Sequence, residues 1–209
     1  MNAEEKLQAE LLSGLYDLST ANGMTAYVMK KNYITKGVDT DWMSQPLQNQ
    51  FNHSHSLYIS GGTEGFRFGT DLSYNHEGGV MKKSYRNRMS VGIYVDYRVG
   101  KLQIRNNVSY DLARSSDSPY GSFSDYTKQQ PYYPIYDDNG KLLQMLAIGI
   151  PNPLYEATLG NFSRGESSNL TNNLSFYWFI NDHLQLQSQF SVTKNDSEDK
   201  DFTDPLSTK

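Results

Sequence analysis

The chain has 209 residues, a formal net charge of −4, no cysteine and 16 tyrosines. This length allows one or two domains, and the lack of cysteine excludes a disulfide framework or a thiolate metal site. The mild acidity, without a basic stripe, argues against nucleic acid as a partner. No apolar run approaches the roughly 18 residues of a transmembrane helix, but a polar average composition is compatible with a wide membrane barrel, whose interior and loops are polar.

Residues 2–18 have the pattern of a helix at the start of the chain. Asn2 and Glu5 are spaced as a capping box, and Gly14 is suited to ending the first turns. A second short helix is predicted around 26–36. The chain is therefore expected to open with a short helical segment.

From His53 the period of the pattern changes to two. Apolar and polar residues alternate along about six strands, as in strands with one apolar and one polar face. The longest example is 84–114, which reads as two arms joined by a tight turn at Gly100-Lys101. Its apolar face comprises Met89, Val91, Ile93, Val95, Tyr97 and Val99 on the first arm and Leu102, Ile104, Val108, Tyr110 and Leu112 on the second. Only Asn106 interrupts that face.

The length of these strands is typical of a membrane protein. Strands in soluble proteins usually run about five or six residues, whereas a strand that crosses a bilayer needs roughly 9–11. The connections alternate in length, as in outer-membrane barrels with short periplasmic turns and long extracellular loops. Short turns are predicted at 61–65, 100–101 and 181–182, and longer segments at 76–85, 114–168 and from 194 onward. We therefore expect an all-β fold, a partial antiparallel transmembrane β-barrel.

The polar faces of the strands are expected to line a wet lumen. Their charged residues should pair with one another or with a plug rather than bind substrate. These residues are Arg67, Asp71, Asp96, Arg98, Arg105 and Asp111. Trp178, near the short-turn end of its strand, suits an aromatic girdle on the periplasmic side.

A soluble β-protein is the alternative to a membrane barrel. Long amphipathic hairpins also occur in large β-sandwiches and lipocalin-like barrels, in which the apolar faces would meet in one core. Such a fold would suit an all-β carbohydrate-binding module. No GxSxG, HExxH or P-loop motif is present, so neither an enzyme nor a cofactor is predicted.

The long segment 114–168 carries the candidate substrate-binding residues. Aromatic faces stack on sugar rings or apolar side chains, and tyrosine adds a hydroxyl at a low entropic cost. The candidates are Tyr120, Phe123, Tyr126, Tyr132, Tyr133 and Tyr136. The alternative is that these rings pack the loop onto neighbouring loops or onto a partner protein.

Two motifs have some likeness to metal sites, but simpler interpretations are favoured. His53 and His55 share one strand face, and no third ligand is evident. Residues 137–140, DDNG, resemble the start of a calcium loop, but the glutamate expected at the twelfth position of an EF-hand is missing. We expect exposed histidines near a strand end, a hairpin turn at 137–140, and no metal site.

Five stretches together resemble the SusC/RagA family of TonB-dependent outer-membrane transporters. They are NAEEKLQAELLSGLY, GVDTDWMSQPL, HSHSLYISGG, DLSYNHEGGVMKKSYRNR and NPLYEATLGNFSRGESSNLTNNLSFYW, which cover most of the chain in the family's order. The resemblance places the chain in the part of the barrel that follows the plug. It implies a barrel of about 22 strands in the outer membrane of a Gram-negative, Bacteroidetes-like bacterium.

The resemblance also implies a function and partners. Members of the family import bulky nutrients, chiefly oligosaccharides or peptides. A SusD-like surface lipoprotein covers the barrel, and the TonB complex supplies energy through a TonB box ahead of the plug. Met1 falls inside a family motif, with no signal peptide, plug or TonB box before it, so the chain is expected to be a fragment of a longer transporter.

The expected organisation is one partial TonB-dependent receptor barrel domain over 1–209. Its parts are a helical and looped lead-in at 1–50, strands at 51–113, a long extracellular loop at 114–168, a hairpin at 169–193 and a loop at 194–209.

Overall fold

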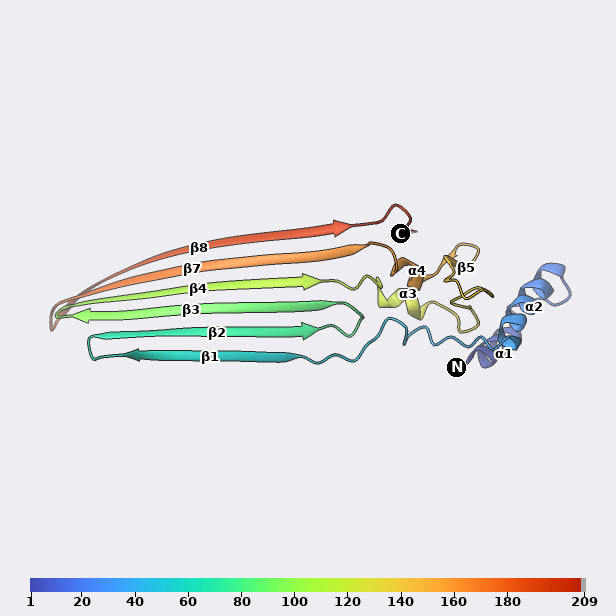
Figure 1. The fold of residues 1–209 in the computed structure, drawn as a ribbon, viewed down its shortest axis with the longest axis horizontal. Coiled ribbons are helices and arrows are strands. Elements are labelled where there is room, and N and C mark those ends of the chain that lie inside the picture. Colours follow the sequence, from blue (N-terminus) through green and yellow to red (C-terminus); the bar gives the residue numbers. More distant parts are fainter. Residues whose placement is uncertain (208–209) are drawn as a thin grey trace.

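The computed structural model describes residues 1–207 and shows a long antiparallel sheet with helices and loops gathered at one end (Figure 1). The elements are α1 (Ala3–Leu12), α2 (Ala21–Thr35), β1 (His53–Gly62), β2 (Phe66–Gly78), β3 (Tyr85–Val99), β4 (Leu102–Ser116), α3 (Phe123–Thr127), β5 (Met145–Ala147), β6 (Ile150–Pro151), α4 (Pro153–Glu156), β7 (Phe162–Asn181) and β8 (Leu184–Phe202). The main sheet has six strands in the order β1-β2-β3-β4-β7-β8, and β5 pairs with β6 separately. The all-β antiparallel prediction is confirmed. Within residues 1–207, no helix is long and apolar enough to cross a membrane.

The N-terminal helix has the predicted capping box. The Asn2 side chain accepts a hydrogen bond from the Glu5 amide at 2.8 Å, and the Asn2 amide donates to the Glu5 carboxylate at 3.0 Å. Gly14, just after the helix, has a φ of +78°, which an L side chain rarely adopts. The second helix begins earlier than predicted, because the Thr20 hydroxyl caps it by accepting from the Gly23 amide at 3.1 Å.

The register of the sheet keeps the two-faced pattern across all six strands. Directly opposite residues of antiparallel strands share a face, so paired residues extend each face sideways. One row of the apolar face runs Leu57, Leu72, Val91, Tyr110 and Leu170 and ends at Lys194 on β8. The matching row of the polar face runs Tyr58, Asp71, Gly92, Ser109, Thr171 and Thr193. The predicted alternation of apolar and polar residues is therefore confirmed as two distinct faces.

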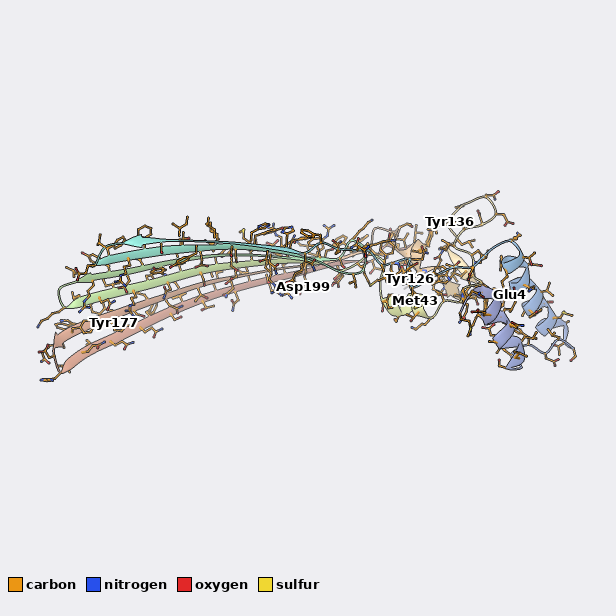
Figure 2. The ribbon with its side chains drawn as sticks, turned by 90° about the horizontal axis from the view of Figure 1, so that it is seen from below. Glu4, Met43, Tyr126, Tyr136, Tyr177 and Asp199 are labelled. Atoms are coloured by element: carbon orange, nitrogen blue, oxygen red, sulfur yellow. The ribbon has the colours of Figure 1, made fainter. Side chains whose placement is uncertain are left out.

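Neither face of the sheet is covered within residues 1–207. Among the helices and strands, the strands of the sheet make extensive contacts with their neighbours in the sheet alone, and Figure 2 shows side chains projecting from both sides of a curved single layer. Leu57, Ile93 and Phe190 are 53%, 50% and 65% exposed. Most residues on the apolar side thus have no partner layer in the described part of the chain.

The last two long strands extend further than predicted. β7 begins at Phe162 and β8 continues to Phe202, and these two residues lie opposite each other. The predicted loops at 162–168 and 194–202 are therefore wrong. Apart from Phe162 and Phe202, both stretches are polar on both faces, so they carry no alternating signal, and backbone ladder hydrogen bonds hold them as strands instead.

The short turns lie at one end of the sheet and the longer connections at the other (Figure 1). At the second end, residues 1–50 pack against 117–161, and we call these two segments the loop module. The Thr40 amide donates to the Pro131 carbonyl at 2.8 Å, and Leu47 bridges to Met81 in the connection between β2 and β3. The lead-in and the long loop, which the sequence separates, form one body.

Candidate functional site

The six candidate substrate-binding aromatics divide between the interior and the surface of the loop module. The buried rings are Tyr126 and Tyr132, the partly buried rings are Tyr120 and Tyr133, and the exposed rings are Phe123 and Tyr136. Tyr126 is 0% and Tyr132 is 1% exposed, so packing of the loop accounts for both. Phe123 and Tyr136 are 38% and 55% exposed and are open to a ligand; Figure 2 shows Tyr136 at the margin of the module.

Tyr126 anchors one of two small apolar cores in the loop module. Its ring packs with Trp42 and Leu146, and its hydroxyl donates to the Pro153 carbonyl at 3.3 Å. The indole nitrogen of Trp42 donates to the Gln130 carbonyl at 3.0 Å, so its one polar atom is satisfied while the ring is 3% exposed. Trp42, from the lead-in, thereby fixes the course of the long loop.

The second core contains a buried carboxylate, Glu10, that the sequence analysis did not identify. The Tyr16 hydroxyl donates to it at 2.5 Å and the Tyr132 hydroxyl at 3.0 Å. The ammonium group of Lys6 lies 3.2 Å from the Glu10 carboxylate, and that of Lys30 lies 3.8 Å from it. Lys30 also donates hydrogen bonds to both tyrosine hydroxyls. We call these five residues the Glu10 cluster; it ties α1, α2 and the long loop together.

The ionisation of the Glu10 cluster follows from its contacts. Burial raises the pKa of the Glu10 carboxyl, but the hydrogen bonds that it accepts and the charge of Lys30 outweigh burial, so its pKa lies below the ordinary value. Burial, and then the hydrogen bonds to Glu10, raise the pKa of Tyr16 and Tyr132. Burial lowers the pKa of Lys30, against the pull of Glu10. The stable arrangement is an ionised carboxylate with two neutral tyrosines as donors.

A signal for Glu10 was present in the sequence. Ala3, Leu7 and Glu10 lie at i, i+4 and i+7 on one helical face, and all three are buried. A carboxylate on the apolar stripe of a helix needs a donor or a cation from another element. Sequence spacing alone does not name that partner, because Tyr132 lies far along the chain.

The charged residues of the polar face pair with one another in part, as expected. Asp96 accepts from Arg105 at 3.0 Å and from Gln103 at 2.7 Å. The guanidinium of Arg105 also lies 5.3 Å from the centre of the Tyr177 ring. The Ser90 hydroxyl is hydrogen-bonded to Asp111 in the same way across two strands. These contacts form a polar lining over the strands and bring together no catalytic arrangement.

The histidine motif gains a third member in the structure. His76 lies opposite His53 in the register, and the ring centroids of His53 are 5.1 Å from His76 and 5.2 Å from His55. The rings of His53 and His76 are stacked rather than convergent. Within residues 1–207, no group of His, Asp and Glu side chains has the geometry of a metal site.

The DDNG stretch forms the predicted hairpin turn. The Asp137 carboxylate accepts from the backbone amides of Asn139 and Lys141 at 2.9 and 2.8 Å. Tyr136 and Leu142 form a bridge on either side of it. The aspartate therefore satisfies the turn's own amides.

Two of the cavities where the sheet meets the loop module adjoin the start of β7. The larger, of about 650 Å³, is bordered by Met81, Ser118 and Asp201 and by the stacked rings of Phe162 and Phe202, whose centroids are 5.8 Å apart. The smaller, of about 520 Å³, lies on the apolar-face side of the strand ends. Both are large enough for a small ligand or headgroup.

No protein-family model matches the chain, and no curated protein matches it either.

Proposed function

We propose that this chain forms part of the wall of a SusC/RagA-type, TonB-dependent importer in the outer membrane of a Gram-negative, Bacteroidetes-like bacterium. The complete barrel would contain about 22 strands and enclose a plug. It would import an oligosaccharide or peptide under a SusD-like lipoprotein, with energy from the TonB complex. In this proposal the apolar face of the sheet contacts the lipid bilayer and the polar face lines the lumen.

The observation that carries the proposal is the height of the apolar belt, which we define on β3 and β4. The belt begins beside the short turn, where Val99 lies opposite Leu102, and ends where Met89 lies opposite Leu112. From Met89 to Val99, β3 advances about 33 Å at roughly 3.3 Å per residue. A strand tilted by about 40° would then span about 25 Å along the membrane normal, which is the height of the lipid-facing band of outer-membrane barrels.

Aromatic residues flank the belt at both ends. Phe66, Tyr97 and Trp178 lie near the short turns, and Tyr74 and Tyr85 lie toward the loop module, all on the apolar face and about 40% exposed. Tyrosine and tryptophan favour membrane interfaces because their rings are apolar and their edges are polar. Their two bands support a sheet that crosses one bilayer.

The belt ends obliquely toward the loop module. On β4 its last apolar residue is Leu112, whereas Ser168 of β7 and Asp196 of β8 already lie in the row of Leu112. The row beyond Leu112 on the same face contains Asn87, Arg114, Glu166 and Glu198, and Arg114 pairs with Glu166 at 2.7 Å. Charged residues in this position suit the water beyond a membrane surface. The strands would thus project outward and carry the loop module above the bilayer, where Phe123 and Tyr136 are our candidates for contact with a nutrient or the lipoprotein.

The test compares the chain in water, in detergent and in neutral phosphatidylcholine vesicles. We expect aggregation in water and co-flotation with vesicles, because the uncovered apolar face needs lipid. A monodisperse monomer in water by light scattering would instead favour the soluble carbohydrate-binding module and contradict the proposal.

Two adjacent substitutions on β4 test which face meets lipid. Val108→Arg places a charge at mid-belt and should cost about 2–4 kcal/mol of folding free energy in vesicles. Asn107→Arg places the same charge on the polar face and should cost far less. Equal costs in urea titrations of the vesicle-bound protein would contradict the face assignment.

A further inference from the structure

Two like charges face each other directly where β7 and β8 leave the apolar belt. Arg164 lies opposite Lys200 in the register of these strands, and like charges in that position destabilise a sheet. Lys200 has one carboxylate partner, Glu198, at 2.9 Å. Arg164 lies 4.9 Å from the centre of the Phe162 ring and forms no ion pair with a carboxylate of residues 1–207. A bound anion would relieve this pairing.

These cations belong to the same face as the apolar belt. Pairing is continuous from Arg164 to Leu170 without a bulge, so the two side chains point to the same side of the sheet. On β4, the last apolar residue of this face is Leu112, four residues from Ser116, which lies opposite Arg164. On β7 itself the last apolar residue is Leu170, six residues from Arg164. At roughly 3.3 Å per residue these separations are about 13 and 20 Å along the strands. They correspond to about 10 to 15 Å above the hydrocarbon after tilt, within reach of headgroups for a long side chain.

The smaller cavity adjoins Arg164 at this level. Its strand residues, Tyr85, Ser116, Phe162 and Arg164, all belong to the belt side. Lys83 lines it as a second, exposed cation. One carboxylate, Asp117, lines it too, so the residues that line the cavity carry a net positive charge.

We propose that Arg164, Lys200 and Lys83 bind the phosphate of an anionic lipid headgroup in the outer leaflet. The inference rests on the proposed membrane location and adds a defined lipid contact to it. A guanidinium binds phosphate oxygens with two parallel hydrogen bonds, and ammonium groups add point charges. The stacking of Arg164 on Phe162 holds the guanidinium in place for this contact, and the cavity of about 520 Å³ accommodates the headgroup.

The experiment measures how the full chain partitions between neutral and anionic vesicles at constant ionic strength. One set contains phosphatidylcholine alone, and the other contains phosphatidylcholine with phosphatidic acid, a phosphomonoester lipid. We expect the wild-type chain to prefer the anionic vesicles by roughly tenfold. Arg164→Gln with Lys200→Gln should abolish most of that preference while binding to phosphatidylcholine is unchanged.

The matched control removes two charges at the same height on the opposite face. Arg86 and Arg88 lie on the polar side of β3 and are exposed, so Arg86→Gln with Arg88→Gln should retain the preference. Equal losses in the two double variants, or no preference in the wild type, would overturn the lipid site. Binding of inorganic phosphate to the wild-type chain, without any preference for the anionic vesicles, would assign the site to free phosphate instead. Failure to bind phosphatidylcholine vesicles at all would refute the membrane proposal itself.

Discussion

Removal of the Glu10 carboxylate should release the lead-in from the long loop. In Glu10→Ala, the hydroxyls of Tyr16 and Tyr132 lose their acceptor and Lys30 loses its counter-ion. Breaking a buried ion pair costs about 3–5 kcal/mol. We expect about 3 kcal/mol here, because the Lys6 side chain is still 32% exposed and can rearrange. That loss corresponds to a roughly 100-fold increase in the population of the open module.

Hydrogen exchange measures this opening directly in detergent-solubilised protein, since local opening sets the protection of the amides of α1 and the long loop. The control is Glu4→Ala on the same helix. Glu4 pairs with Lys31, and the two side chains are 55% and 42% exposed, so losing the pair should cost less than about 1 kcal/mol. If both variants exchange alike, the Glu10 cluster does not hold the module together.

Three further outcomes follow from the geometry. Because the pKa of Glu10 is lowered in the folded state, its contribution to stability is present above its unfolded pKa of about 4.3 and is lost as pH falls through the folded value. Acid should therefore lower the protection of these amides, relative to their intrinsic exchange rates, in the wild type but not in Glu10→Ala. Asn106→Leu should raise the urea midpoint in vesicles, corresponding to about 1–3 kcal/mol, because the side-chain oxygen Oδ1 of Asn106 is buried without a hydrogen-bond partner among residues 1–207. Arg105→Leu should cost less than about 1 kcal/mol in the same titration, because Arg105 is half exposed and Asp96 keeps Gln103 as a donor.

The strands of the belt could be predicted because a two-sided environment imposes a two-residue period. Every second residue of β3 from Met89 to Val99 is apolar or aromatic, and the intervening ones are polar or glycine. Beyond the belt most residues on both faces of β7 and β8 are polar, so that period disappears although the strands continue. The two stretches that we wrongly predicted as loops, 162–168 and 194–202, therefore lie where no difference between the two faces imposes an alternating pattern.

The loop module could not be predicted because its contacts join distant segments. Nothing near Trp42 indicates that it will cover Tyr126, and nothing near Tyr132 indicates Glu10. Composition correctly indicated an aromatic loop but could not divide rings that pack inside from rings that face outward. The exposed Tyr136 beside the DDNG turn was predictable as a loop tip, because that turn is specified by local residues.

The apolar belt and the inferred headgroup site depend on one register. Successive residues of a strand point to opposite faces, so a slip of β8 by one residue against β7 would turn Lys200 to the polar side and carry Phe190 and Val192 there with it. In the proposed membrane setting, these three positions would then lose their contacts with lipid or phosphate together. The cost of turning Phe190 away from lipid would thus also hold Lys200 opposite Arg164. The unfavourable pairing of Arg164 with Lys200 can persist because the apolar belt fixes the register of β7 and β8. A bound phosphate would then need only to offset the repulsion between these two cations.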